Sequence, residues 1–308
     1  MDFGPHLLLA TFEGAVGAAV LALTALGLSL VFGVMRVVNV AHGEFFMLGA
    51  VAAWFAASHL GGHPAIGFVA ALIVAPIFAA LIAILVDSLV LKRVDYDPEA
   101  TIVATIGILY IIQQATLMTY GPEARPVAPP FSHRIALPWL EFTENGIEFY
   151  YPWGLSVTTY KVFVIAAAAS ILLAFRLFLS RSRMGLVMQA TRIDRETAQA
   201  FGIPVGRVYS IVFGVGAGLA ALAAVLIVPI QQAHYLMGGD PLLLSFIVVI
   251  IGGLGSIRGT VMAALLIGMS DGIISVFFSP TLAKIIATVL VAMVLVHRPQ
   301  GLYGKKPA

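Results

Sequence analysis

Long apolar blocks dominate this sequence and limit the folds open to it. Eight blocks have about the length that crosses a membrane, since roughly 20 helical residues span a 30 Å hydrocarbon core. A ninth, at about 242–257, is shorter and ends in glycines, which predicts a short tilted span or a half-helix buried in protein. We expect an all-α, polytopic membrane protein with 8–9 spans. The eight blocks lie at about 10–34, 40–59, 65–91, 101–119, 161–180, 208–229, 259–278 and 282–297.

Composition excludes several other classes of protein. Hydrophobic residues make up 60% of the 308 residues and charged residues 10%, whereas soluble domains carry about a quarter charged residues. The blocks are longer than the strands of an outer-membrane barrel. A net charge of +2 gives no sign of nucleic-acid binding, and the absence of cysteine rules out disulfides and thiolate chemistry. We expect one transmembrane domain over residues 1–308.

The placement of lysine and arginine predicts the orientation, because these residues collect on the cytoplasmic side. Lys92 and Arg93 follow one block, and six arginines lie in or beside the segment 181–207. The connection 120–160 instead carries four glutamates against two arginines and is expected outside the cell. Alternating sides leaves the N-terminus outside, provided that the short ninth block crosses.

Small residues recur at the spacing of close helix packing. Gly214 and Gly218 lie four residues apart before an alanine-rich run, and Gly14 is followed by Ala18. Such surfaces let helix backbones approach in a membrane. We expect packing within the chain, with a subunit interface as the alternative. No internal repeat is visible in the sequence.

The segment 181–207 is too polar to cross a membrane. Its apolar residues recur at helical spacing, which predicts a short helix with one narrow apolar stripe. Gly202 and Pro204 should end this helix. It is either a simple connection between two spans or a rigid protrusion that a motor subunit grips. The expected stripe comprises Ala190, Ile193, Thr197, Ala200 and Phe201.

Three stretches resemble one known family. Glu196-Thr197-Ala198 followed by Gly202 and Pro204 resembles the loop through which permeases of ATP-binding-cassette (ABC) transporters contact their ATPases, with Thr197 in place of an alanine. The run 188–208 is similar to that loop in branched-chain amino-acid permeases. The stretches 27–45 and 251–259 resemble other signature segments of the same family.

This resemblance implies a permease in a bacterial inner membrane, forming the path for leucine, isoleucine or valine. Members of the family also carry urea, short amides or aromatic acids, and the residues do not decide among these. The implied partners are two ATPase subunits, a second related permease and an extracytoplasmic solute-binding protein. ATP and Mg²⁺ would bind the ATPases, and no cofactor is expected on this chain. The implied ATPase-coupling residues are Arg192, Asp194, Glu196, Thr197, Ala198, Gly202 and Pro204.

Polar residues within the blocks are candidates for the substrate path, because polar groups at membrane depth are costly and often functional. Asn39, His42 and Glu44 lie where the first block leads into the second. They either line the path, take a gating or structural role, or lie at the cytoplasmic surface. Gln113 and Gln114, in the fourth block, either face the path or hydrogen-bond between helices.

Gly252, Gly253 and Gly255 resemble part of a phosphate-binding loop, but the complete G-x-x-x-x-G-K-[ST] motif is absent from the sequence. We therefore interpret them as a hinge and expect no ATP hydrolysis by this chain. No metal-ligand or Ser/His/Asp pattern predicts an enzyme. Asp271 and Lys284 would form an ion pair if a tight turn joins their helices.

The sequence leaves two alternative functions open. An ion-coupled secondary transporter or channel would carry paired acidic or histidine residues along several spans, and this chain has few. A scaffolding subunit would tolerate changes in the segment 181–207 without loss of transport.

Overall fold

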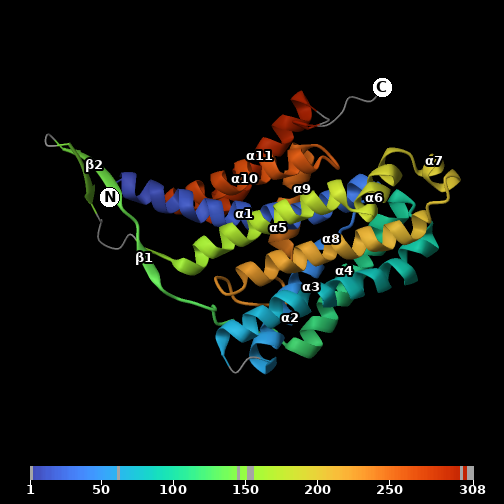
Figure 1. Cartoon of the computed structure of the whole chain (residues 1–308), viewed down its shortest axis with the longest axis horizontal. Helices are drawn as coiled ribbons and strands as arrows, with labels where there is room; N and C mark the ends of the chain where they lie inside the picture. Colours follow the sequence, from blue (N-terminus) through green and yellow to red (C-terminus); the bar gives the residue numbers. More distant parts are fainter. Residues whose placement is uncertain (1–2, 61–62, 144–145, 151–155, 299–300, 304–308) are drawn as a thin grey trace.

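The computed structural model describes residues 3–60, 63–143, 146–150, 156–298 and 301–303 and confirms an all-α polytopic fold (Figure 1). Seven of the described helices, α1, α3, α4, α5, α8, α10 and α11, are long and apolar enough to cross a membrane. The helices are α1 (Phe3–Met35), α2 (His42–Leu60), α3 (Pro64–Leu89), α4 (Pro98–Tyr120), α5 (Thr159–Arg181), α6 (Arg183–Ile193), α7 (Arg195–Ala200), α8 (Val205–Ile227), α9 (Gly239–Gly252), α10 (Ile257–Phe277) and α11 (Pro280–His297), with a short 3₁₀ helix at Leu91–Val94.

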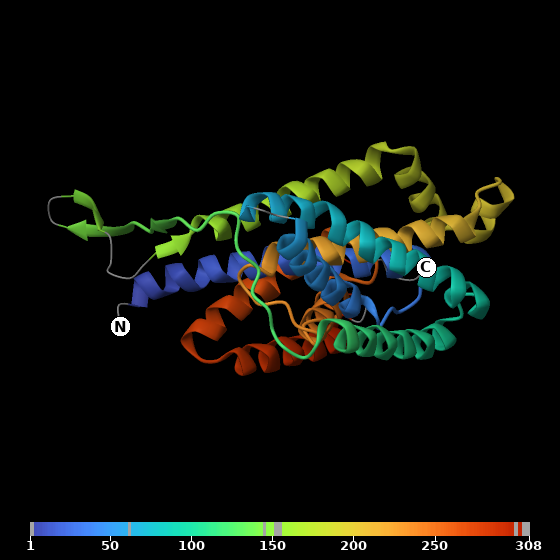
Figure 2. The ribbon, with the colours of Figure 1, turned by 90° about the horizontal axis from the view of Figure 1, so that it is seen from below.

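The connection 120–160 contains short strands that the sequence did not predict. Two antiparallel pairs form there, β1 with β4 and β2 with β3. These strands lie at the same end of the bundle as the start of α1, whereas α6 and α7 lie at the opposite end (Figures 1 and 2). We call these the outer and inner ends, following the charge distribution. The strands are β1 (Arg134–Ala136), β2 (Trp139–Thr143), β3 (Gly146–Tyr150) and β4 (Ser156–Thr158).

Capping residues fix where several helices begin. Asp97 accepts a hydrogen bond from the Ala100 amide at 2.9 Å, and Ser279 accepts one from the Leu282 amide at 3.2 Å. Proline follows both caps at the first helical position, where its missing N–H costs nothing. These signals start α4 and α11 directly after tight connections.

Helix α2 begins inside the bundle rather than at its inner end. After α1 ends at Met35, residues 36–41 fold back along it, so that His42 Nε2 donates to the Thr24 carbonyl over 2.9 Å. Thr24 lies eleven residues before the end of α1, a distance of about 16 Å along the helix. Residues 36–41 are followed by the 19 residues of α2, and because α2 begins inside the bundle we call it a half-helix.

Helix α9 repeats this arrangement in the opposite direction. Residues 228–238 return from the outer end of α8, and the Gly238 carbonyl lies against Gly43 at the start of α2. The helix then runs inward for 14 residues, and the turn after it places Gly255 against Gly33 near the end of α1. The short ninth block is thus a half-helix, which lies beside the seven described helices that are long and apolar enough to cross a membrane.

The two halves of the chain form an inverted repeat. Helices α1–α4 and α8–α11 follow the same course with opposite polarity, and α1 packs along α10 as α8 packs along α3. Gly27 and Gly216 meet reciprocally where α1 crosses α8, because a Cβ on either would run into the backbone of the other. The repeat was not visible in the sequence, because two halves can share a backbone course without sharing residues at equivalent positions.

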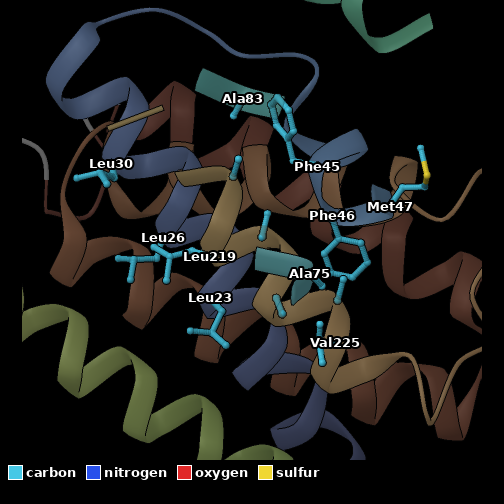
Figure 3. Packing of buried hydrophobic residues seen from close by; sticks show 14 of the residues in the cluster. Leu23, Leu26, Leu30, Phe45, Phe46, Met47, Ala75, Ala83, Leu219 and Val225 are labelled. Carbon is cyan, nitrogen blue, oxygen red and sulfur yellow. The ribbon is translucent and has the colours of Figure 1, made fainter. Parts of the chain in front are cut away.

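Large apolar residues from four helices fill the core. Leu23, Leu26 and Leu30 of α1 pack with side chains of α2, α3 and α8 in one cluster (Figure 3). The phenylalanine rings of α2 and α8 meet edge to face, with centroids 5.7 Å apart for Phe45 and Phe213.

The predicted small-residue surfaces pack within the chain. Ala18 meets Gly268 of α10, and Gly218 meets Ala80 of α3. These close approaches confirm the expectation of packing within the chain.

Candidate functional site

The polar segment at the inner end forms two helices rather than the single one expected. Asp194 separates α6 from α7 with extended backbone angles, φ −150° and ψ 112°. Its carboxylate accepts hydrogen bonds from the Glu196 and Thr197 amides, at 2.9 and 3.1 Å, and from Thr197 Oγ1 at 2.5 Å. The prediction of one helix was wrong because an aspartate that caps amides ahead of it ends the preceding helix.

The same hydrogen bonds perturb the ionisation of this cap. Donation by the Thr197 hydroxyl, then by the Thr197 and Glu196 amides, lowers the pKa of Asp194, and the charge of Arg36 acts in the same direction. Asp194 is therefore a carboxylate at neutral pH and holds α7 in one orientation.

The end of α7 follows the predicted pattern. Gly202 has φ +80°, a left-handed conformation that favours glycine. Its amide donates to the Gln199 carbonyl at 2.9 Å, and the Ile203 amide donates to the Ala198 carbonyl at 3.0 Å. Pro204 then occupies the cap of α8.

The apolar side chains of this segment point away from the rest of the chain. Ile193 is 79% exposed, Phe201 83% and Leu186 55%, whereas Ala198 is buried against the bundle. We call Leu186, Ile193 and Phe201 the coupling surface. Large apolar side chains exposed on a polar segment at one end of the molecule indicate contact with a partner.

Aromatic and polar contacts connect α7 to the bundle. The Arg195 guanidinium lies 5.7 Å from the ring centre of Tyr209, which meets Tyr96 edge to face at 4.8 Å. Burial, and then the charge of Asp87, raises the pKa of Tyr96, so this phenol stays protonated. Asp87 is fully buried and accepts from Ser210 Oγ at 2.6 Å. Asp87 was not among the predicted site residues, although a lone acid within an apolar block was the available signal.

The inner end also brings α6 to the glycine-rich turn. Gln189 and Arg192 line a small crevice with Gly33 and Gly255. Two groups of predicted residues, the coupling segment and the hinge, therefore lie side by side.

The chain's C-terminal part lies across the other side of the same turn. The Leu302 amide donates to the Ile251 carbonyl at 2.8 Å, and the Tyr303 amide donates to the Gly252 carbonyl at 3.2 Å. Gly253 has φ +98°, and Gly301 packs directly against it. The predicted hinge is thus held between α6 and residues 301–303.

Asn39, His42 and Glu44 lie together in the centre of the bundle, not at the cytoplasmic surface. Asn39 accepts the Ala41 amide at 3.0 Å, which shapes the turn before α2. His42 is fully buried, and its Nδ1 has no partner among the described residues. Glu44 is 3% exposed, and its Oε2 also lacks a protein partner in the described part of the chain. Their place at the junction of the half-helices suits gating or structural support.

Gln113 and Gln114 occupy a different place. Gln113 is half-buried and Gln114 exposed on α4, on a face that also presents Ile111 and Met118. This face is open to lipid or to another chain, whereas the His42 group is enclosed between α1, α8 and α9.

Lys284 pairs with a different acid from the one that the sequence predicted. Lys284 Nζ lies 2.7 Å from Asp240 Oδ2 at the start of α9, and no ion pair joins it to Asp271 among the described residues. The prediction was wrong because it placed α11 only against α10, whereas α11 also packs against α9, whose first turn carries the nearer acid. No group of three or more metal-ligating residues occurs in the described ranges.

Comparison with known proteins decides the family. The family model "Branched-chain amino acid transport system / permease component" matches residues 10–296. The chain belongs to this family. It is therefore a multi-pass membrane permease subunit of an importer, as the loop and signature segments predicted.

Two relatives and one structure extend this result. The high-affinity branched-chain amino acid transport system permease protein LivH of Escherichia coli strain K12 is 26% identical over 96% of this chain and 94% of its own length. LivM of the same strain, also a permease of that system, is 24% identical over 90% of this chain and 66% of its own length. PsaBC from Streptococcus pneumoniae, solved in complex with Fab, has a TM-score of 0.50 and 12% identity over 94% of this chain and 92% of that one, which shows a shared fold.

Proposed function

We propose that this permease draws its energy from two ABC ATPase subunits that grip the coupling surface. The exposed Phe201 and Ile193 on capped helices are the observation that carries the proposal. A partner would bury these side chains, and a rigid helix transmits displacement where a flexible loop would absorb it. ATP and Mg²⁺ would bind those subunits, and this chain would bind no cofactor and catalyse no reaction.

Two contacts offer routes from this surface into the bundle. Arg195 and Tyr209 connect α7 to α8, and Arg192 connects α6 to the turn at Gly255. The turn directly follows α9, whose other end meets the start of α2 at Gly43. Movement of α6 and α7 would therefore reach the junction of both half-helices.

We infer the other partners and the substrate from the family to which the chain belongs. A second related permease would complete the path in the inner membrane, as suggested by likeness to both LivH and LivM. A solute-binding protein would deliver leucine, isoleucine or valine from outside the cell. Urea, short amides and aromatic acids are the alternative substrates.

Co-purification from native membranes in mild detergent tests the coupling surface. Phe201→Asp is compared with Phe278→Asp, because Phe278 is a phenylalanine that is 74% exposed after the outer end of α10, away from the coupling surface. We expect ATPase chains with the wild type and Phe278→Asp, and their loss with Phe201→Asp while the second permease remains. Equal ATPase recovery from both variants would contradict the role of this surface.

Uptake measurements separate this proposal from an ion-coupled transporter. Leucine uptake into proteoliposomes containing the complete complex should require ATP and persist without an ion gradient. Uptake that follows a proton or sodium gradient and ignores ATP would favour the secondary-transporter alternative.

A further inference from the structure

A cavity of about 350 Å³ opens between α1, α9, α10, α11 and the connection 228–238. This volume is near the lower end of ligand pockets, which span roughly 300–1,000 Å³. Gly17 and Gly268 line it without side chains, and a Cβ on Gly17 would meet nothing within 4 Å. The space is suited to a small solute.

Three charged side chains lie along this cavity, Asp240, Asp271 and Lys284. Lys284 pairs with Asp240, but an ammonium group carries three donors, so two remain. Asp271 has no cation within 4.0 Å among the described residues. The group therefore offers donors at one point and, at another, a carboxylate that no ion pair with a described residue occupies.

Apolar side chains form much of the remaining lining. Val20 and Leu21 come from α1, Phe46 from α2, and Leu244 from α9. A pocket that combines an acid, a cation and an apolar wall matches the three parts of an aliphatic amino acid.

The floor of the cavity connects to the centre of the bundle. Thr24 lines it, and the Thr24 carbonyl accepts the hydrogen bond from His42 at the start of α2. A solute in the cavity would rest directly above the junction of the half-helices.

We infer that this cavity is a binding site for the zwitterion of a free aliphatic amino acid, an assignment that rests on the proposed function as an amino-acid permease. Asp271 receives the α-ammonium group, the free donors of Lys284 receive the α-carboxylate, and Leu21 and Leu244 contact the aliphatic side chain. Asp240 holds Lys284 in place. An uncharged amide such as urea can hydrogen-bond to Asp271 and Lys284 but forms no ion pair with either, so it should bind more weakly.

Cysteine protection in the full-length chain, reconstituted in lipid nanodiscs, tests this site. The chain contains no cysteine, so Leu236→Cys introduces one thiol, at a cavity residue that is 51% exposed. At leucine concentrations about ten times the dissociation constant, alkylation should slow by about tenfold, since only the unoccupied fraction reacts. Leu254→Cys, far from the cavity, should react at one rate with and without leucine.

Analogues and second variants identify what the site recognises. We expect little protection by 4-methylpentanoate, which lacks the ammonium group, by isopentylamine, which lacks the carboxylate, or by urea. Asp271→Asn and Gly17→Leu should abolish protection by leucine, with each rate compared with that of the same variant without ligand. Gly107→Leu is the matched control, because a Cβ there also meets nothing within 4 Å and lies on α4, outside the cavity lining.

Several outcomes would overturn the inference. Equal protection by urea or by 4-methylpentanoate, or protection that survives Asp271→Asn, would show that the cavity does not recognise a zwitterion. ATP-driven leucine uptake by the complete complex keeps the two proposals apart. Normal uptake by Asp271→Asn and Gly17→Leu would overturn this site alone, whereas no leucine uptake by the wild-type complex would overturn the proposed function.

Discussion

Where α1 crosses α8, backbone touches backbone, and Gly27 and Gly216 leave no room for a side chain on either helix. In α6 and α7, by contrast, Ile193 and Phe201 extend away from the chain, and few residues are buried. The crossing is completed by this chain alone. Asp194 and Gly202 fix the shape of the segment that carries the coupling surface, but no described residue of this chain covers its exposed apolar side chains. The comparison separates what this chain stabilises by itself from what it presents to a partner.

The largest effect is expected at the crossing. Gly27→Ala places a methyl group against the Gly216 carbonyl and should lower the free energy of unfolding by about 3 kcal/mol, the upper range for overpacking, because a backbone cannot move aside as a side chain can. Thermal unfolding of the purified chain measures this change. Gly17→Ala on the same helix is the control and should be neutral or stabilise by up to about 1 kcal/mol. Equal stabilities would mean that the crossing is looser than described.

A second prediction concerns Phe201, where stability and function should separate. Phe201→Ser removes an exposed ring, so thermal unfolding should match the wild type. If a partner buries the ring as an interface anchor, affinity should fall by about 2 kcal/mol or more, roughly thirtyfold. Titration of the purified ATPase against the permease measures this. A loss of stability in Phe201→Ser would instead assign the ring to this chain's own packing.

A third, smaller effect is expected between the two regions. Ser210→Ala removes a 2.6 Å hydrogen bond to the buried carboxyl of Asp87 and should destabilise the chain by about 1.5 kcal/mol, the low end for bonds to charged groups, because Lys92 stays 3.7 Å from that carboxyl. Ser170→Ala is the control, because Ser170 is exposed on α5 and bonds only to the Ala166 carbonyl. If both variants unfold alike, Asp87 does not depend on Ser210.

The smallest effect concerns the cap of α7 and depends on pH. Because the folded state lowers the pKa of Asp194, its contribution is present above the ordinary value of 3.8 and is lost as pH falls through the lowered folded value. Hydrogen exchange of residues 195–200 at pH 7 should be slowest in the wild type, faster in Asp194→Asn and fastest in Asp194→Ala. Wild type and Asp194→Asn should converge in acid. Identical exchange rates in all three proteins would show that the Asp194 cap does not stabilise α7.

The lengths and spacing of apolar residues predicted most of the fold. Apolar blocks located the spans, and Gly202 and Pro204 located the end of α7, because each of these features acts within a few residues. The break at Asp194 was missed since apolar spacing alone cannot show that a carboxylate caps the amides ahead of it.

The centre was harder to foresee. Asn39, His42 and Glu44 were recognised as a group, but their depth follows from residues 36–41 folding back, and from Gly238 meeting Gly43 almost 200 residues away. Asp240 was likewise missed as the partner of Lys284. The depth of this group and the partner of Lys284 both depend on contacts between segments far apart in the sequence. In a single sequence the residues that make these contacts are only isolated glycines and charged residues.

The inverted repeat has a consequence for the direction of transport. In a bundle made of two matching halves of opposite polarity, the inner and outer openings are structurally equivalent. The repeated helices alone therefore set no direction for transport. The segments between the halves, with strands at one end and α6 and α7 at the other, break this equivalence. Vectorial movement would then originate in the connection rather than in the repeated helices.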